Sequence, residues 1–302
     1  MTACPNCAGP GKVFVKVFGD TLHRCRRCGL IFLWPWPDHG EMVRRHLSAE
    51  YAAHPYFQAG EAAADKDGLA IHSRVLSILQ QHLPAGAHVL DVGAGSGDFL
   101  KQAAAAGFTP AGIEPSPHLA GRIRERLSCP LFVGPFETYD EPASADAVLL
   151  MDVIEHAADP RRMLAHALTT LKPGGILFVC TVDSSCLLYR LAPSIAVLRP
   201  AVKKAGYLLQ RIFCYQHNWY FNRPVLRSLV EQAGFRVLEH RGYEFPLNRL
   251  RESQFIKLGL RGLYLAHALL GARTEQYLVA VKLTDAQRTN VATFTIPSAR
   301  AG

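Results

Sequence analysis

The sequence predicts a doubly wound α/β protein, in which a mostly parallel sheet with an antiparallel last strand follows a small cysteine-rich ribbon. Short apolar runs alternate with helix-like patterns between residues 84 and 283, as expected where helices connect the strands of one sheet. A glycine-rich turn follows the first of these runs, and two Cys-x-x-Cys pairs stand near the N-terminus. A chain of 302 residues can hold one large domain and one small one.

The glycine-rich turn is the most informative segment of the chain. The apolar run 89–92 leads into Gly93, Gly95 and Gly97, after which an apolar helical pattern resumes. This order predicts a buried strand, a tight turn and the start of a helix. Glycines are needed because a ligand must approach the backbone where a Cβ atom would block it. Asp98 stands where a dinucleotide-binding fingerprint would have its third glycine.

Further strand-like runs follow in order. The second run, 110–113, ends in Glu114, an acid placed where it can accept hydrogen bonds from ribose hydroxyls. Segment 171–175 is expected to end a helix before the fifth strand, and the helical pattern 69–83 precedes the first strand. The remaining predicted strands, of which the last two should form an antiparallel hairpin edge, are 130–133, 145–150, 176–179, 235–239 and 276–282.

Four ordered motifs resemble the class I S-adenosylmethionine-dependent methyltransferases, whose fold is Rossmann-like. They are the glycine loop, the acid after the second strand, Asp152-Val153-Ile154-Glu155-His156 after the fourth, and Leu171-Lys172-Pro173-Gly174-Gly175 before the fifth. The resemblance covers residues 70–182 well and the rest loosely, and it implies S-adenosyl-L-methionine as methyl donor. A nucleotide-binding fold with another chemistry is the alternative, although the loop spacing disfavours a nicotinamide oxidoreductase.

The resemblance also implies which residues bind the donor. The three glycines would let the backbone approach the methionine and ribose portions, Asp91 would face the ammonium group, and Glu114 would bind the ribose hydroxyls. Phe136, just after the third strand, would either flank the adenine or be a core aromatic. Asp152 would lie at the mouth of the cofactor pocket, because open α/β sheets bind ligands beyond the carboxyl ends of their strands.

His156 and His217 are the candidate catalytic residues. A hydroxyl acceptor needs its proton removed or its oxygen held by a metal. His217 lies in a segment, 215–221, that resembles the histidine-plus-aromatic segment of the ubiquinone-biosynthesis O-methyltransferases. In that family an acidic-plus-histidine cluster can bind a divalent cation, and Asp152, Glu155 and His156 match its pattern in part. A helix that starts at this segment would place all three side chains on one face. The alternative is that Glu155 and His156 are a structural pair at a helix start and only help to fix the fold.

Cys4, Cys7, Cys25 and Cys28 have the two-knuckle spacing of a zinc ribbon. Four thiolates give Zn²⁺ a closed, structural site, and so short a segment needs the metal to fold. A redox dithiol pair is the competing interpretation. The run 28–37 resembles the junction of bacterial methyltransferases with an N-terminal zinc ribbon, several of which act on sugars or in polysaccharide and natural-product pathways.

Charge is unevenly spread along the chain. The formal net charge is +8, and residues 199–273 alone hold thirteen basic and four acidic residues. This segment suits an anionic acceptor such as a nucleotide-linked sugar or a phosphorylated carrier, an acidic membrane surface, or RNA. A solvated face without a partner fits equally. No signal peptide and no run of membrane-spanning length is visible, so we expect a cytoplasmic protein with at most peripheral membrane contact.

The expected domains are the zinc ribbon at 1–40, a helical linker and cofactor-covering helix at 41–83, and the methyltransferase domain at 84–283, whose acceptor lid spans about 183–220. A disordered tail should occupy 284–302. The leading hypothesis is methylation of a small-molecule acceptor at oxygen or carbon. The acceptor is expected to be a sugar, a lipid-linked molecule or a natural-product- or quinone-like one, and the apolar lid suits an apolar or lipid-linked acceptor better than a sugar.

The alternative hypothesis is an RNA methyltransferase that binds its substrate through the ribbon. It predicts a motif such as Asn-Pro-Pro-Tyr after the fourth strand, where the sequence instead reads Met-Asp-Val-Ile over 151–154. Nucleic acid is therefore disfavoured as a partner. A binding protein without turnover would show damaged glycine or acidic positions, and these positions are intact.

Overall fold

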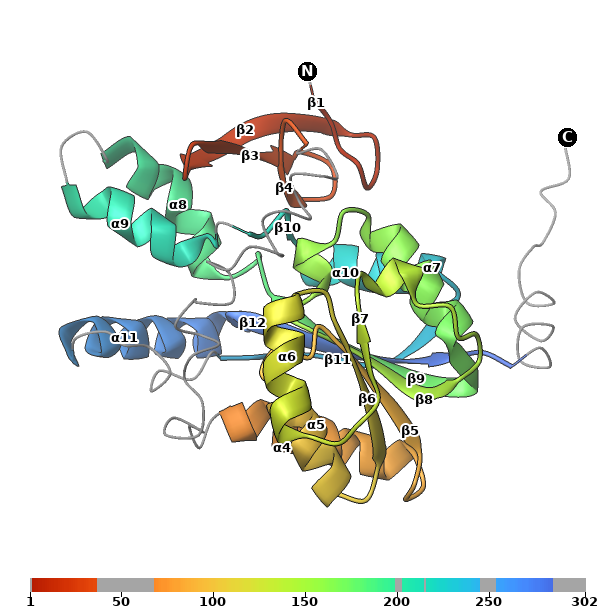
Figure 1. Cartoon of the computed structure of the whole chain (residues 1–302). Coiled ribbons are helices and arrows are strands. Elements are labelled where there is room, and N and C mark those ends of the chain that lie inside the picture. The colour runs from red at the N-terminus through yellow and green to blue at the C-terminus, as the bar shows by residue number, and fades with distance from the viewer. Residues whose placement is uncertain (1, 37–67, 199–202, 215, 245–253, 285–302) are drawn as a thin grey trace, which may run out of the picture.

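The computed structural model contains two β-sheets, one near the N-terminus and one that forms the body of the molecule (Figure 1). The structure describes residues 2–36, 68–198, 203–214, 216–244 and 254–284. Most of the expected linker and nearly all of the expected disordered tail lie outside these described residues.

The larger sheet has seven strands and confirms the predicted mixed α/β architecture. β12 is antiparallel to both of its neighbours, whereas the strands from β9 to β7 run parallel to one another. The carboxyl ends of β5, β6 and β8 therefore meet at one edge. In sheet order the strands are β11 (Phe235–Tyr243), β12 (Glu275–Lys282), β9 (Leu171–Val182), β8 (Ala145–Met151), β5 (His88–Val92), β6 (Thr109–Glu114) and β7 (Leu131–Val133).

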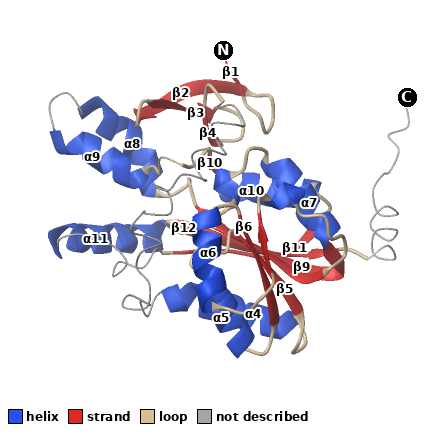
Figure 2. Cartoon of the chain, viewed as in Figure 1, coloured by secondary structure: helices blue, strands red, loops and turns tan. Residues whose placement is uncertain are grey.

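Helices cover both faces of this sheet (Figure 2). Successive side chains of a strand point to opposite faces, so Val89 packs beneath α4 and α5 while its neighbour Leu90 packs beneath α7 and α10. α6 packs beside α5 through Ile123 and Leu100. The helices are α4 (Gly68–His82), α5 (Asp98–Ala105), α6 (Pro117–Arg126), α7 (Pro160–Thr170) and α10 (Arg223–Gln232).

Three of these helices begin with the same local chemistry. A side-chain oxygen of the N-cap residue accepts a backbone N–H of the first turn, and a proline stands at the first or second helical position. Proline lacks an N–H that would be left unpaired there and already has a helical φ. The N-cap residues are Ser116 for α6, Asp159 for α7 and Asn222 for α10.

The segment 171–175 differs from the expectation of a simple break. α7 ends at Thr170 as predicted, but β9 already begins at Leu171, which pairs with Ala145, and regular pairing resumes between Ile176 and Ala147. Four residues of β9 thus oppose a single residue of β8, which is a bulge that increases the local twist.

The smaller sheet joins the ribbon to the large domain. Its last strand comes from far along the chain, because Trp219 pairs with Phe32 and Tyr220 pairs with Ile31. The ribbon therefore shares main-chain hydrogen bonds with a segment of the expected acceptor lid. In sheet order the strands are β1 (Thr2–Ala3), β2 (Pro10–Val17), β3 (Asp20–Cys25), β4 (Ile31–Leu33) and β10 (Trp219–Tyr220).

The expected lid folds as two helices that pack on the ribbon. α8 (Leu187–Leu198) and α9 (Lys203–Ile212) contribute Tyr189 and Leu209 to a core that also contains Val15 of β2. A third helix, α11 (Gln254–Leu270), lies between β11 and β12 in the chain and projects from the same side of the molecule (Figure 1). Among the described helices, none is both long and apolar enough to cross a membrane.

Candidate active site

The glycine loop begins where β5 ends. Gly93, Gly95 and Gly97 all have positive φ angles, of 73°, 55° and 78°. The N–H of Gly93 donates to the carbonyl of Ile113 at 2.8 Å, which folds the loop back over β6. A Cβ atom on Gly93 would lie 2.8 Å from Cγ2 of Val153. Glycine is therefore required at this position by both backbone conformation and space.

Two acidic residues flank this loop on adjacent strands. Asp91 and Glu114 are each 2% exposed. The Glu114 carboxylate accepts hydrogen bonds from the N–H groups of Gly95 and Ser116, both at 2.8 Å. Burial raises the pKa of Asp91 to about 8, with help from the negative charge of Glu114. Burial likewise raises the pKa of Glu114 to about 7, although its two backbone hydrogen bonds oppose the shift. A cationic ligand here would favour the ionised carboxylates.

The segment after β8 connects the glycine loop with the candidate catalytic residues. Asp152 has a φ of 53°, uncommon for a residue with a Cβ atom, and its Oδ1 lies 3.9 Å from Sγ of Cys180. The expected helix start is instead a single turn of 3₁₀ helix, η3 (Ile154–His156). Because Asp152 stands in a left-handed turn before η3, it does not share a helical face with Glu155 and His156.

Hydrogen bonds between two distant segments bring His156 and His217 together. The N–H of Asn218 donates to the carbonyl of Glu155 at 2.9 Å, and its side-chain amide donates to the carbonyl of His156 at 3.0 Å. The indole of Trp219 donates to the carbonyl of Ala157 at 2.8 Å. As a result the two imidazole rings lie 4.7 Å apart between centroids and nearly perpendicular.

The tautomer of His156 follows from its neighbour. Its Nδ1 lies 3.0 Å from the carbonyl oxygen of Gln216, an atom that can only accept. The proton is therefore assigned to Nδ1, and the lone pair of the ring is at Nε2. A lone pair at Nε2 is what a base or a metal ligand requires.

Glu155 completes a cluster with the two histidines. It is fully buried, and within the described part of the chain neither of its carboxylate oxygens accepts a hydrogen bond. Burial and the nearby Asp152 carboxylate raise its pKa well above the usual range. One ligand atom each of Glu155, His156 and His217 lies within 4.8 Å of the others. This donor set fits a divalent cation, and it differs from the expected set in containing His217 in place of Asp152.

Phe136 follows β7 and is tightly packed. It begins the 3₁₀ turn η2 (Phe136–Thr138), is 3% exposed, and packs edge-on against the ring of His166 at 4.7 Å between centroids. It is therefore part of the hydrophobic core.

The four N-terminal cysteines form a second cluster. Sγ of Cys4 lies 3.7 Å from that of Cys28, and Sγ of Cys7 lies 3.5 Å from that of Cys25. All four sulfur atoms lie within 4.8 Å of one another. Thiolates around one tetrahedral Zn²⁺ would be about 3.8 Å apart, given a Zn–S bond of about 2.3 Å. The arrangement therefore fits the ion.

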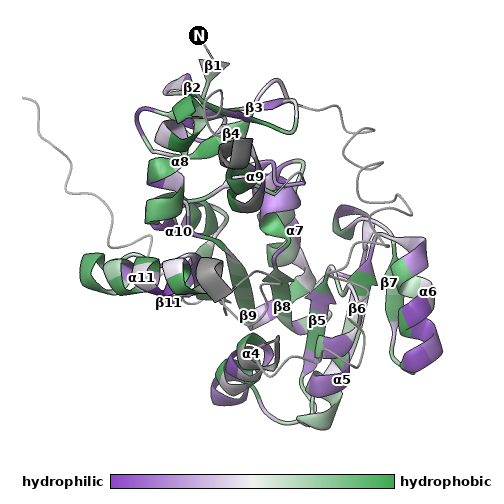
Figure 3. Ribbon diagram, turned by 90° about the vertical axis from the view of Figure 1, so that its left-hand side faces the viewer, coloured by the Kyte–Doolittle hydropathy of each residue, from purple (hydrophilic) through white to green (hydrophobic). Residues whose placement is uncertain are grey.

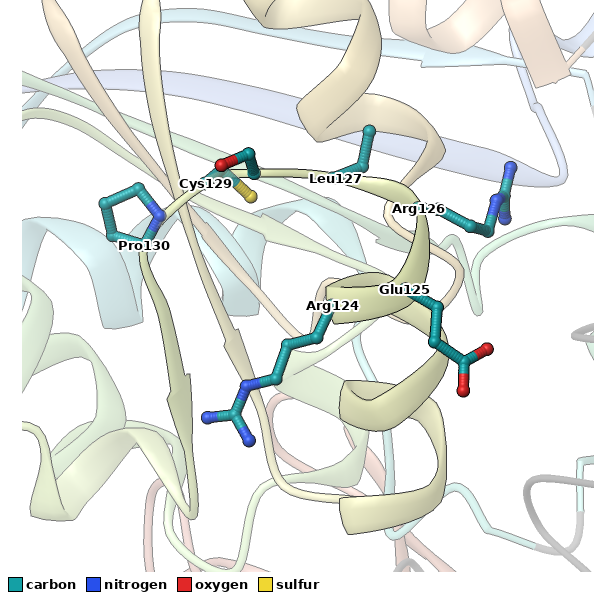
Figure 4. Close-up of a pocket in the computed structure, with 7 residues that line it drawn as sticks. Arg124, Glu125, Arg126, Leu127, Cys129 and Pro130 are labelled. Carbon is teal, nitrogen blue, oxygen red and sulfur yellow. The ribbon is translucent and has the colours of Figure 1, made fainter.

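Two surface hollows lie elsewhere. The larger, with a volume of about 640 Å³, is lined by residues 124–130, which span the end of α6 and the segment that follows it (Figure 4). A smaller one of about 310 Å³ lies between the ribbon and α7 and is lined by Trp34, Trp36 and Trp219 among others. None of the predicted cofactor-binding residues lines either hollow, so neither corresponds to the predicted donor site.

An open α/β sheet with a glycine loop and an acid on the adjacent strand defines an enzyme that binds a nucleoside-containing cofactor. Residues 65–240, more than half of the chain, match the family described as a methyltransferase domain. The chain belongs to this family, the class I S-adenosylmethionine-dependent methyltransferases. The expected fold class and enzyme class are thereby confirmed.

Several relatives of this chain share the name ubiquinone biosynthesis O-methyltransferase. The ubiquinone biosynthesis O-methyltransferase of Ralstonia nicotianae is 30% identical over 214 residues, which are 67% of this chain and 79% of the relative. That of Cupriavidus pinatubonensis is 28% identical over 179 residues, 55% of this chain and 67% of the relative. A chain of the complex between the Haloferax volcanii Trm112 methyltransferase activator and a methyltransferase is 18% identical. It superimposes with a TM-score of 0.53 over 76% of this chain and 98% of its own, and supports the fold alone.

The structure adds residues that the sequence did not single out. Asn218 holds the two histidine segments together, and Val153 touches the glycine loop. The sequence points to Asn218 and Val153 only indirectly, because each lies in a motif that is recognised by a neighbouring histidine or acidic residue.

Proposed function

We propose that this protein transfers a methyl group from S-adenosylmethionine to a hydroxyl oxygen of a small molecule. The observation that carries the proposal is the cluster of Glu155, His156 and His217 beyond the carboxyl end of β8. Val153, two residues before this cluster, lies against the glycine loop, so a donor on the loop and an acceptor at the cluster would be neighbours. The names of the relatives favour oxygen as the methylated atom and offer no support for RNA as the acceptor.

The donor-binding roles follow from the buried acids and the loop. When bound, S-adenosylmethionine supplies an activated methyl group and its own leaving group. Asp91 would hold the donor's ammonium group, Glu114 would accept hydrogen bonds from the ribose hydroxyls, and the glycines would allow close backbone approach. The cationic donor offsets the cost of ionising two buried carboxylates. Asp152 lies at the mouth of this pocket. Phe136, packed in the core, is not included.

The acid–histidine cluster acts on the acceptor. A bound divalent cation would polarise the hydroxyl oxygen and ease loss of its proton. The base is one of the two histidines, with Nε2 of His156 holding a lone pair for the proton. With its proton held by the base, the acceptor oxygen would be left as the nucleophile for the methyl group that the donor supplies. Holding these groups in line contributes several kcal/mol to lowering the barrier.

The four cysteines bind a structural Zn²⁺ in this proposal. The metal stabilises the ribbon. Because β4 of the ribbon pairs with β10, the metal also helps to fix the position of the segment that contains His217. The ribbon therefore acts as a support for the acceptor side of the site. The region 183–220 contacts the ribbon as well as flanking the acceptor.

Donor binding is tested by calorimetric titration with S-adenosylhomocysteine, with zinc quantified in the same sample. Glu114→Gln keeps the size of the side chain but weakens its acceptance from two N–H groups and from ribose. We expect at least tenfold weaker binding and one zinc per chain in both proteins. Glu125→Gln, at an exposed position of α6, is the matched control and should bind normally. Normal binding by Glu114→Gln would remove the assigned donor site.

Acceptor chemistry is tested by assaying catechol and phenol acceptors with the wild type, His156→Ala and His217→Ala. Turnover should fall at least 100-fold in one or both variants, because general base catalysis contributes about 10²- to 10⁴-fold. The same assay with a chelator that leaves the zinc content unchanged tests the divalent cation separately, because the chelator removes the cation but not the histidine base. If both variants turn over like the wild type, the cluster has no catalytic role.

A further inference from the structure

α11 is apolar on the side that faces away from the body of the protein. Leu258, Leu265 and Leu269 are 63%, 69% and 89% exposed. Spacings of seven and four residues place them on one stripe of a helix. The other side of the helix carries Leu263 and Tyr264, which are partly buried. A helix that is apolar on both sides is normally covered on both sides.

The described part of the protein leaves this stripe uncovered. None of the described hydrophobic core clusters contains a leucine of α11. The helix is instead held near its C-terminal end by His267, which is fully buried. Its Nε2 accepts the N–H of Leu187 at 3.2 Å, and its Nδ1 lies 3.3 Å from the Glu244 carboxylate. The helix is anchored by polar contacts while Leu258, Leu265 and Leu269 face outward.

The neighbouring helices extend the same surface. Leu191, Val197 and Leu198 of α8 are 50%, 78% and 54% exposed, and Leu208 of α9 is 44% exposed. α8, α9 and α11 project from one side of the molecule (Figure 1), and Figure 3 views that side, where much of α8 and α11 is green. We call the exposed apolar residues of these three helices the leucine face.

Charge indicates what the leucine face contacts. α8, α9 and α11 contain no aspartate or glutamate, whereas six lysines and arginines lie in them. A second copy of the chain would bring the same positive charge and be repelled. An anionic lipid surface instead attracts these helices, because basic residues next to it are drawn to the negatively charged headgroups. Helices that combine exposed leucines with basic residues lie in the membrane interface.

We propose that the leucine face docks this protein on the surface of an anionic lipid bilayer. The apolar side chains of the leucine face enter the boundary between headgroups and acyl chains, and the net positive charge of the three helices favours the anionic headgroups. Contact is peripheral, since no described helix can cross a membrane. This inference does not depend on the methyl-transfer proposal, because binding to vesicles requires neither donor nor acceptor.

The test is flotation of the full chain with vesicles of phosphatidylcholine alone or with one third phosphatidylglycerol. We expect binding to the anionic vesicles that weakens as salt rises, because salt screens the charges. Leu265→Gln combined with Leu269→Gln should lower the partition coefficient at least tenfold, since two leucines no longer enter the bilayer. The matched control is Leu238→Gln, a leucine of β11 that is 42% exposed, and it should bind like the wild type.

Folding is monitored by the thermal midpoint and by affinity for S-adenosylhomocysteine, neither of which should change in the double variant. The proposal is overturned if the wild type does not float with anionic vesicles, or if the double variant floats equally well. It is also overturned if sedimentation shows a wild-type dimer that the double variant converts to monomer, because a second copy would then cover the face.

Discussion

Gly93→Ala should destabilise the protein more than a glycine substitution of equal backbone strain elsewhere. The methyl group would meet Cγ2 of Val153 at 2.8 Å, and the residue has a φ of 73°. The left-handed backbone costs about 1–2 kcal/mol for alanine. Overpacking against Val153, a partly buried neighbour that packs on the core, adds about 1–3 kcal/mol. The expected loss in free energy of unfolding is therefore about 2–5 kcal/mol.

Gly86→Ala supplies the matched control. Gly86 has a φ of 79°, and nothing lies within 4 Å of the position its Cβ would take. Both substitutions reduce the entropy of the unfolded chain equally, so that contribution cancels in the comparison. The free energy of unfolding of the control should fall only by the cost of the left-handed backbone, about 1–2 kcal/mol. The difference of about 1–3 kcal/mol isolates the contact with Val153.

Urea unfolding followed by far-ultraviolet circular dichroism measures both variants against the wild type. Equal losses in Gly93→Ala and Gly86→Ala would refute the reasoning, because Val153 would then move away without cost. In that event the close approach between the glycine loop and the segment before η3 could not be used to place donor and acceptor side by side.

Two further predictions concern the buried acids and the ribbon junction. The pKa values of Asp91 and Glu114 are raised from 3.8 and 4.5 to about 8 and about 7 in the folded protein, so the folded state holds protons that the unfolded state has lost. The free energy of unfolding without donor should therefore fall as pH rises from about 4 toward 8, by up to about 1.4 kcal/mol per pH unit and group. Asp91→Asn should flatten this slope in urea midpoints measured from pH 5 to 8, and an unchanged slope would contradict the assignment. The side chain of Asn222 accepts a hydrogen bond from the N–H of Val225 at 3.0 Å and donates one to the carbonyl of Cys28 at 2.8 Å. Asn222→Ala removes both bonds and should lower the free energy of unfolding by about 2–3 kcal/mol in urea unfolding. Asn222→Asp keeps the helix cap but loses the donor, and should lower it by about 1–2 kcal/mol. Full stability in Asn222→Asp would mean that the bond to the ribbon contributes nothing.

The sequence alone is sufficient for the order of the strands in the large sheet and of most helices between them, and for the edge of the sheet at which the glycine loop and its two flanking acids meet. A strand, a glycine turn and a helix start are local features, set by residues within a few positions of one another. Once the strands are expected to be parallel, their carboxyl ends must meet at one edge. That is why Asp91, Gly93 and Glu114 can be grouped from their positions along the chain, and why the two Cys-x-x-Cys pairs are expected to face one another.

Contacts between distant segments are decided only by the tertiary structure. His217 joins Glu155 and His156 because Asn218 bonds to the turn after β8 while β10 pairs with the ribbon. The expected acceptor lid forms two helices that pack on that ribbon, and the segment 171–175 lies inside a strand. None of these pairings leaves a periodic signal in the sequence, because each depends on which surfaces remain to be covered after the local elements have formed.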